Sequence, residues 1–83
     1  MTDELESISI ASVVAIEAAQ DLERLEHVRA LYTGDKGPVA SYLARAQRLP
    51  AAEQEAAREA AAGVLREIEA AAVKRLAELE QRG

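Results

Sequence analysis

The sequence contains no cysteine, no tryptophan and no phenylalanine, and only two prolines and four glycines among 83 residues. Without cysteine the chain can form neither a disulfide nor a thiolate metal site, which is consistent with a reducing compartment. Tyr32 and Tyr42 are its only aromatic residues, although 49% of all residues are hydrophobic. The apolar content is therefore mostly Ala, Leu, Val and Ile, a composition typical of closely packed helices.

Long hydrophobic runs are also missing, since no window approaches the roughly 20 apolar residues that cross a membrane. Asp3, Glu4 and Glu6 stand where a secretory signal peptide would carry Lys or Arg. We therefore expect no membrane association and a cytoplasmic protein. A chain of 83 residues has room for one domain with a thin core, and for no large catalytic cleft.

Basic residues are fewer than acidic ones: the chain has 15 Asp and Glu but only 10 Lys and Arg, and its formal net charge is −5. This balance opposes indiscriminate binding to nucleic acids or to anionic lipids. Contact with a polyanion would have to be made by a local basic patch.

The few helix-breaking residues gather at one place, where Gly34, Gly37 and Pro38 interrupt an otherwise helix-forming sequence. Glycine permits a positive φ, Asp35 can hydrogen-bond its own backbone, and proline suits the first turn of a helix. The pattern predicts that one helix ends near Tyr32, that another begins near Pro38, and that the hinge of a helical hairpin lies between them.

Helical spacing predicts four helices, at about residues 3–19, 21–32, 38–47 and 51–82, within one domain of residues 1–83. The segment from Ile8 to Val14 would also suit a short strand, but no second strand is present to pair with it. Asp21 either caps the second helix or marks a kink. The expected buried stripes of the first three helices are Leu5, Ile8, Ser12 and Ile16; Leu22, Leu25, Val28 and Tyr32; Val39, Tyr42, Leu43 and Ala46.

The last helix carries a coiled-coil seam, with a 3-4-4-3 spacing of Leu65, Ile68, Ala72, Leu76 and Leu79. The nearest partner for this seam is the first half of the chain. A connector over residues 33–50 would lay the long helix antiparallel against residues 3–32, with both tyrosines at the tip. The predicted fold is therefore all-α, an antiparallel helical hairpin or coiled coil with a short connector helix.

Catalytic chemistry is not indicated. His27 is the only histidine, and Glu23 is the one other residue near it that could bind a metal ion. We therefore predict no metal site and no cofactor. No serine has a base arranged to activate it, and Glu67 and Glu69 point to different sides of a helix. We expect a protein that is not an enzyme by itself.

A basic patch with two tyrosines is the candidate for binding, and we expect it at the hinge end of the hairpin. Cations can contact phosphates, and a tyrosine can stack on a base. The alternative is that both tyrosines pack the corner while the cations are merely solvated. The candidate RNA-binding residues are Arg29, Lys36, Arg45, Arg48, Tyr32 and Tyr42.

The hinge residues also carry a family resemblance, which extends without a gap over residues 21–53. Tyr-x-Gly-x-Lys-Gly, followed by Leu-Pro, resembles the N-terminal domain of the bacterial phenylalanyl-tRNA synthetase alpha subunit. Asp35 and Ala44 depart from that pattern, because the family usually or often has Lys at both positions. The matching residues are Asp21, Leu22, Leu25, Arg29, Tyr32, Gly34, Lys36, Gly37, Leu49, Pro50 and Glu53.

The resemblance implies a coiled coil that contacts tRNA and an active site in a separate class II domain, whose motifs are absent here. It implies basic contacts at Arg29, Lys36 and Arg48. The first hypothesis is thus a noncatalytic tRNA-contacting appendage, either as part of such a subunit or as a free-standing relative. The alternative is a protein-interaction hairpin that has lost RNA binding and docks a partner helix. Self-association, the partner's identity and whether Gly83 is a natural end stay open.

Overall fold

The computed structural model describes residues 2–82, nearly all of which are helical. The helices are α1 (Thr2–Ala18), α2 (Leu22–Thr33), α3 (Pro38–Ala46) and α4 (Ala51–Arg82). Each of these bounds lies within a residue of the range expected from the sequence. Residues 2–82 contain no strand, and the β-branched segment from Ile8 to Val14 lies inside α1. The all-α prediction is confirmed.

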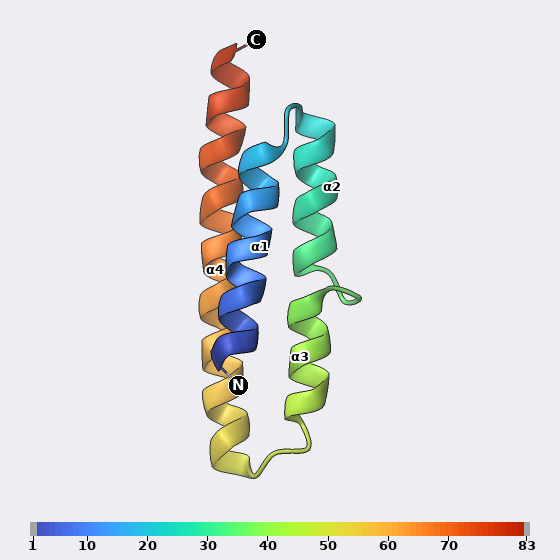
Figure 1. Ribbon diagram of the computed structural model, residues 1–83, viewed down its shortest axis with the longest axis vertical. Helices are drawn as coiled ribbons and strands as arrows, with labels where there is room; N and C mark the ends of the chain where they lie inside the picture. Colours follow the sequence, from blue (N-terminus) through green and yellow to red (C-terminus); the bar gives the residue numbers. More distant parts are fainter. Residues whose placement is uncertain (1, 83) are drawn as a thin grey trace.

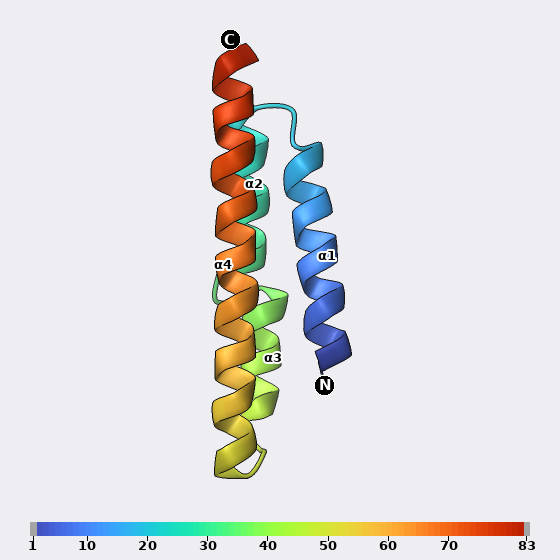
Figure 2. The ribbon, with the colours of Figure 1, turned by 90° about the vertical axis from the view of Figure 1, so that its left-hand side faces the viewer.

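The helices form three arms that lie lengthwise beside one another: α1, α2 followed by α3, and α4 (Figures 1 and 2). In the view of Figure 1 the chain runs upward through α1, reverses across residues 19–21 and runs downward through α2 and α3. It reverses again across residues 47–50 and runs upward through α4. We call residues 22–46 the α2–α3 arm. This arm is antiparallel to α4 and completes the predicted hairpin. The molecule is 49 Å long, which is about the length of the 32-residue α4 at 1.5 Å per residue.

Two details of the expected hairpin are wrong. The chain does not reverse at residues 34–37, because α3 continues in the direction of α2 beyond a looped excursion (Figure 1). The expectation that residues 3–19 run antiparallel to the long helix also fails, since α1 is parallel to α4. The physical reason is the tight connection at residues 19–21, which reverses the chain before the glycine pair is reached.

The glycines are needed for close backbone approach rather than for a positive φ. Gly34 and Gly37 have φ of −78° and −81°, and no described glycine has a positive φ. A Cβ on Gly34 would lie 2.6 Å from the carbonyl oxygen of Ala30, and one on Gly37 would collide with that of Leu31. The loop folds so tightly onto the end of α2 that any side chain at these positions would strike its carbonyls.

Side-chain caps fix the two reversals. A carboxylate oxygen of Asp21 accepts a hydrogen bond from the Arg24 N–H at 2.7 Å, so Asp21 is the N-cap of α2 rather than a kink. At the second reversal the Gln54 side-chain amide donates to the carbonyls of Gln47 and Leu49, at 2.8 and 2.7 Å. These bonds satisfy backbone carbonyls of the turn between α3 and α4.

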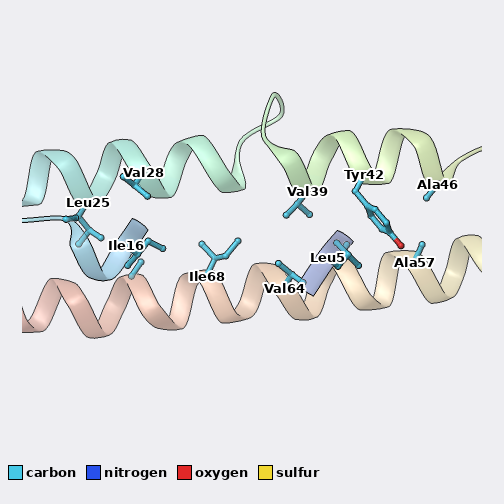
Figure 3. Close-up of a cluster of buried hydrophobic side chains, with 13 residues drawn as sticks. Leu5, Ile16, Leu25, Val28, Val39, Tyr42, Ala46, Ala57, Val64 and Ile68 are labelled. Atoms are coloured by element: carbon cyan, nitrogen blue, oxygen red, sulfur yellow. The ribbon is translucent and has the colours of Figure 1, made fainter. Parts of the chain in front are cut away.

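The core lies where the three arms meet, and Figure 3 shows side chains of α4 pointing toward those of the α2–α3 arm. Ile16, Leu25 and Ile68 are its largest completely buried aliphatic side chains. Ser12 is also buried and donates its hydroxyl to the Ser9 carbonyl at 2.9 Å. The buried hydrophobic residues are Leu5, Ile16, Ala19, Leu25, Val28, Val39, Tyr42, Ala46, Ala57, Ala61, Val64, Ile68 and Ala72.

Two stripes differ in part from their prediction. Leu22 is 46% exposed, because it lies about a quarter turn away from the direction midway between Leu25 and Val28. On α4 the seam includes Ile68 and Ala72 as expected, but Leu65, Leu76 and Leu79 are only partly buried. Since α4 packs against α1 and the α2–α3 arm at once, its most buried strip faces between them and includes Val64 in place of Leu65.

Candidate nucleic-acid interface

The six predicted binding residues all lie on the α2–α3 arm or in the connections that follow its helices. Arg29 and Tyr32 are in the last turns of α2, Lys36 is in the loop, and Tyr42 and Arg45 are in α3. Arg48 follows in the turn that leads to α4. The nine residues of α3 alone span about 14 Å, so these side chains follow the length of the arm instead of gathering at one end.

Arg29 is engaged in two ion pairs. Its Nη1 lies 3.2 Å from both carboxylate oxygens of Glu69 in α4, and its Nη2 lies 2.9 Å from Glu26. These hydrogen bonds, first to Glu26 and then to Glu69, together with the charges of both carboxylates, raise the pKa of Arg29 above its ordinary value. The guanidinium therefore stays charged and links α2 to α4.

Arg45 pairs with an acid from α1. Its Nη2 donates to the Glu4 carboxylate, and its Nε donates to the Ser41 carbonyl at 3.4 Å. Both partners of the ion pair keep substantial exposure, at 62% and 40% of their side chains. Such an exposed pair contributes about 0–1 kcal/mol, so a competing anion can replace Glu4 at little cost.

Lys36 and Arg48 are the exposed cations of the set that have no ion pair within residues 2–82. Lys36 projects from the loop between two glycines, and Arg48 follows the C-terminus of α3. The acidic neighbour in sequence is Asp35, and no acid occurs between Lys36 and Ala52. The segment from Lys36 to Ala52 therefore carries positive charge with no acidic residue of its own.

The two tyrosines have different environments. Tyr42 is 4% exposed, and its ring points toward α4 near Ala57 (Figure 3). A ring buried in this way packs the core and is not available to stack on a base, which favours the packing interpretation for Tyr42. Tyr32 is half-buried and packs against the same core.

One further cation near the end of α3 was not among the residues predicted from the sequence. Arg58 is exposed on α4 and lines a shallow cavity of about 200 Å³ together with Leu43, Ala46, Gln47 and Gln54. The reversal across residues 47–50 brings Arg58 beside the end of α3. Its signal in the sequence is weak, because the position of that reversal is needed to place it beside α3.

Residues 2–82 provide no group of three His, Cys, Asp or Glu side chains that could hold a metal ion. His27 is exposed on α2 and lies at an open surface with Asp21, Glu23 and Arg24. None of the four described helices combines the length and the apolar character that crossing a membrane requires.

Comparison with known proteins agrees with the family resemblance of the hinge residues. A family model described as "Aminoacyl tRNA synthetase class II, N-terminal domain" matches residues 20–82. The phenylalanine–tRNA ligase alpha subunit of Desulfosudis oleivorans is 37% identical over 71 residues, which are 86% of this chain and 21% of that subunit. The chain thus spans about a fifth of the length of this relative. No solved structure matches the chain significantly.

Proposed function

The chain belongs to the family of N-terminal domains of class II aminoacyl-tRNA synthetases, the family found in the phenylalanine–tRNA ligase alpha subunit, and from this membership we propose that it is a noncatalytic helical appendage that contacts tRNA. The matched relative is almost five times as long as the part it shares with this chain. We assign aminoacylation to the part of such a subunit that this chain does not match. The role left to a helical appendage is to hold the RNA.

The observation that carries this proposal is the charge of residues 36–52. The chain as a whole has a net charge of −5, yet this segment has Lys36, Arg45 and Arg48 and no acid. Its helix α3 lies along one edge of the molecule with these cations exposed. Arg45 lies on α3, Lys36 in the loop before it and Arg48 in the turn after it. Exposed Lys and Arg at intervals along a helix and its flanking turns suit contacts with successive phosphates of a backbone, which position an RNA without reading its sequence.

Two of the candidate cations form ion pairs within the chain. Arg45 is bound to Glu4, and Arg29 to Glu26 and Glu69. Because the pair between Arg45 and Glu4 is exposed and weak, a phosphate that approaches α3 can compete with Glu4, whereas Arg29 is partly buried and held by two carboxylates. We expect Lys36 and Arg48 to make the main contacts and Arg45 to add a weaker one.

Binding of tRNA at several salt concentrations tests the proposal, with fluorescence anisotropy as the readout. Two to four phosphate contacts predict that the logarithm of the binding constant falls with the logarithm of salt with a slope of about −2 to −4. The double variant Lys36→Glu/Arg48→Glu should weaken binding about tenfold or more at low salt, while its circular dichroism spectrum stays that of the unmodified chain.

The matched control is Arg66→Glu/Lys74→Glu, which changes the net charge equally at two exposed positions of α4. Neither side chain forms an ion pair within residues 2–82, so their reversal should leave the fold intact and tRNA binding nearly unchanged. Equal losses from the two double variants would mean that net charge alone governs binding. Absence of tRNA binding at low salt would reject the proposal in favour of a protein-interaction hairpin.

A further inference from the structure

The outer face of α1 exposes aliphatic side chains that the fold does not use. Ile10 and Val14 are 63% and 59% exposed, and they are one helical turn apart on the same face. They belong to a nine-residue segment, Ile8 to Ile16, that contains no charged residue. Single exposed aliphatic residues are ordinary, but a neighbouring pair within an uncharged helical segment forms a patch that a partner could cover.

This patch borders a groove between α1 and α4. Two shallow cavities of about 430 and 410 Å³ follow one another along these helices, and no residue of α2 or α3 lines either of them. Glu67 lines both cavities and accepts a hydrogen bond from the Ser9 hydroxyl across the groove. In Figure 2, α1 and α4 lie side by side with the α2–α3 arm behind α4, so the groove is open on a face that the arm does not cover.

The groove has an apolar floor. In the first cavity Leu5 and Val64 are almost completely buried, and Ile10 forms part of the wall. In the second cavity Val13 of α1 faces Ala70 and Ala71 of α4. Small residues on α4 opposite branched residues on α1 leave room for side chains to enter from outside.

The rim of the groove is acidic. Helix α1 has four acids and no Lys or Arg. Among the residues that line the two cavities, Glu6, Glu17, Glu67 and Glu78 outnumber the cations. Lys74 and Arg75 line the second cavity, but Arg75 is committed to the carbonyl of Ala19, at 2.9 Å, and to Glu78.

We propose that this α1–α4 groove binds an amphipathic helix of a partner protein whose apolar stripe is flanked by Lys and Arg. The two cavities are centred about nine residues apart along α4, roughly 13 Å, which suits large apolar side chains about two helical turns apart, at positions i and i+8 of the bound helix. Basic flanks would meet the four glutamates, whereas a second copy would bring an equally acidic α1 and an RNA would bring phosphates.

The experiment uses two fluorescein-labelled synthetic peptides of roughly 18 residues, the length of a helix that spans both cavities. Both have Leu at helical i, i+4 and i+8 spacing, and they differ only in carrying Lys or Glu at the flanking positions. Anisotropy should show binding of the Lys peptide and none of the Glu peptide. The substitution Ile10→Asp should weaken binding of the Lys peptide about tenfold or more.

Matched controls separate the groove from general attraction to an acidic protein. Val73→Asp changes a β-branched residue of α4 that is 64% exposed, as Ile10 is on α1, but lies outside the groove, so it should leave the affinity unchanged. Glu6→Gln/Glu17→Gln should weaken peptide binding severalfold, whereas Glu53→Gln/Glu55→Gln, at exposed positions of the first turns of α4, should not. Lys36→Glu/Arg48→Glu should also leave peptide binding intact, because the proposed tRNA contacts use other side chains.

Several results would overturn the proposal. They are failure of the Lys peptide to bind at low salt, equal binding of the Glu peptide, and equal effects of Ile10→Asp and Val73→Asp. Sedimentation supplies a further test, because a dimer of the unmodified chain that Ile10→Asp dissociates would assign the groove to a second copy.

Discussion

Ile68 is the residue at which the packing of α4 is most sensitive to shortening, because its side chain is completely buried between two other arms. Ile68→Ala should lower the free energy of unfolding by about 2–4 kcal/mol, through lost burial and the cavity left behind. Ala70→Ser, two residues away on an exposed face of α4, should cost far less. Thermal or denaturant melts compare the two, and equal destabilisation would show that the seam faces another way.

The glycines allow a second test at the same scale. Gly37→Ala would drive a Cβ into the carbonyl oxygens of Leu31 and Tyr32, which are backbone atoms that cannot turn aside, and should cost about 1–3 kcal/mol. Gly63→Ala places its Cβ in open space, with the Arg66 guanidinium nearest at 3.9 Å, and removes a flexible residue from the interior of α4.

Gly63→Ala should therefore stabilise the chain by about 0.5–1 kcal/mol. The opposite signs of the two glycine variants in the same denaturant melts are the expected result. A stabilising Gly37→Ala would contradict the close approach of the loop to the end of α2.

At the residue scale, the sequence predicts those roles that depend on nearby residues and not those that depend on distant parts of the chain. The sequence predicted the buried positions Leu25, Val28 and Ile68, because helical spacing alone assigns them to one face. It assigned Tyr42 both to the buried stripe of the third helix and to the candidate RNA-binding residues, and it could not decide between them, since this depends on which neighbour covers α3. Nor could it distinguish glycine used for positive φ from glycine used for close approach, which differ only in the path of the loop.

At the scale of elements, the end of α1 is held by a side chain from α4. The Arg75 Nε donates to the Ala19 carbonyl at 2.9 Å, and only 17% of the Arg75 side chain is exposed. A cation at the C-terminus of a helix also suits the negative end of the helix dipole. Arg75→Leu should therefore destabilise the fold by about 1–2 kcal/mol and speed amide hydrogen exchange in the last turn of α1.

Lys74→Leu is the control for this prediction, since Lys74 is exposed and forms no ion pair within residues 2–82. It should leave hydrogen exchange in α1 unchanged. Equal effects of Arg75→Leu and Lys74→Leu would show that the hydrogen bond to Ala19 contributes nothing to α1.

Helix positions and helix directions differ in how far a sequence determines them. The four helices could be predicted because caps, prolines and apolar spacing are local signals, as at Asp21, Pro38 and Pro50. The direction of α1 could not, because it depends on the path of the short connection after Ala18 and on contacts such as that of Arg75 with the Ala19 carbonyl, which join parts of the chain that are distant in sequence. The most visible signal, the glycine pair, marked a loop and not the reversal.

At the scale of the whole molecule, charge is divided between two surfaces. The edge formed by residues 36–52 is basic and free of acids, and α1 carries four acids and no Lys or Arg. The ion pair between Glu4 and Arg45 joins the two surfaces. This division lets a chain with a net charge of −5 bind a polyanion with one edge while its α1–α4 groove repels it.

The most direct test of tRNA contact through the α2–α3 arm is an NMR titration of the isotope-labelled chain with tRNA. The account predicts that amide signals shift or broaden along residues 36–48, with smaller changes near Arg29 and none at Ile10, Val14 or Ala70. The changes should reverse as salt is added. Changes centred on α1 or the α1–α4 groove, or none at residues 36–48 when tRNA is bound, would contradict the account.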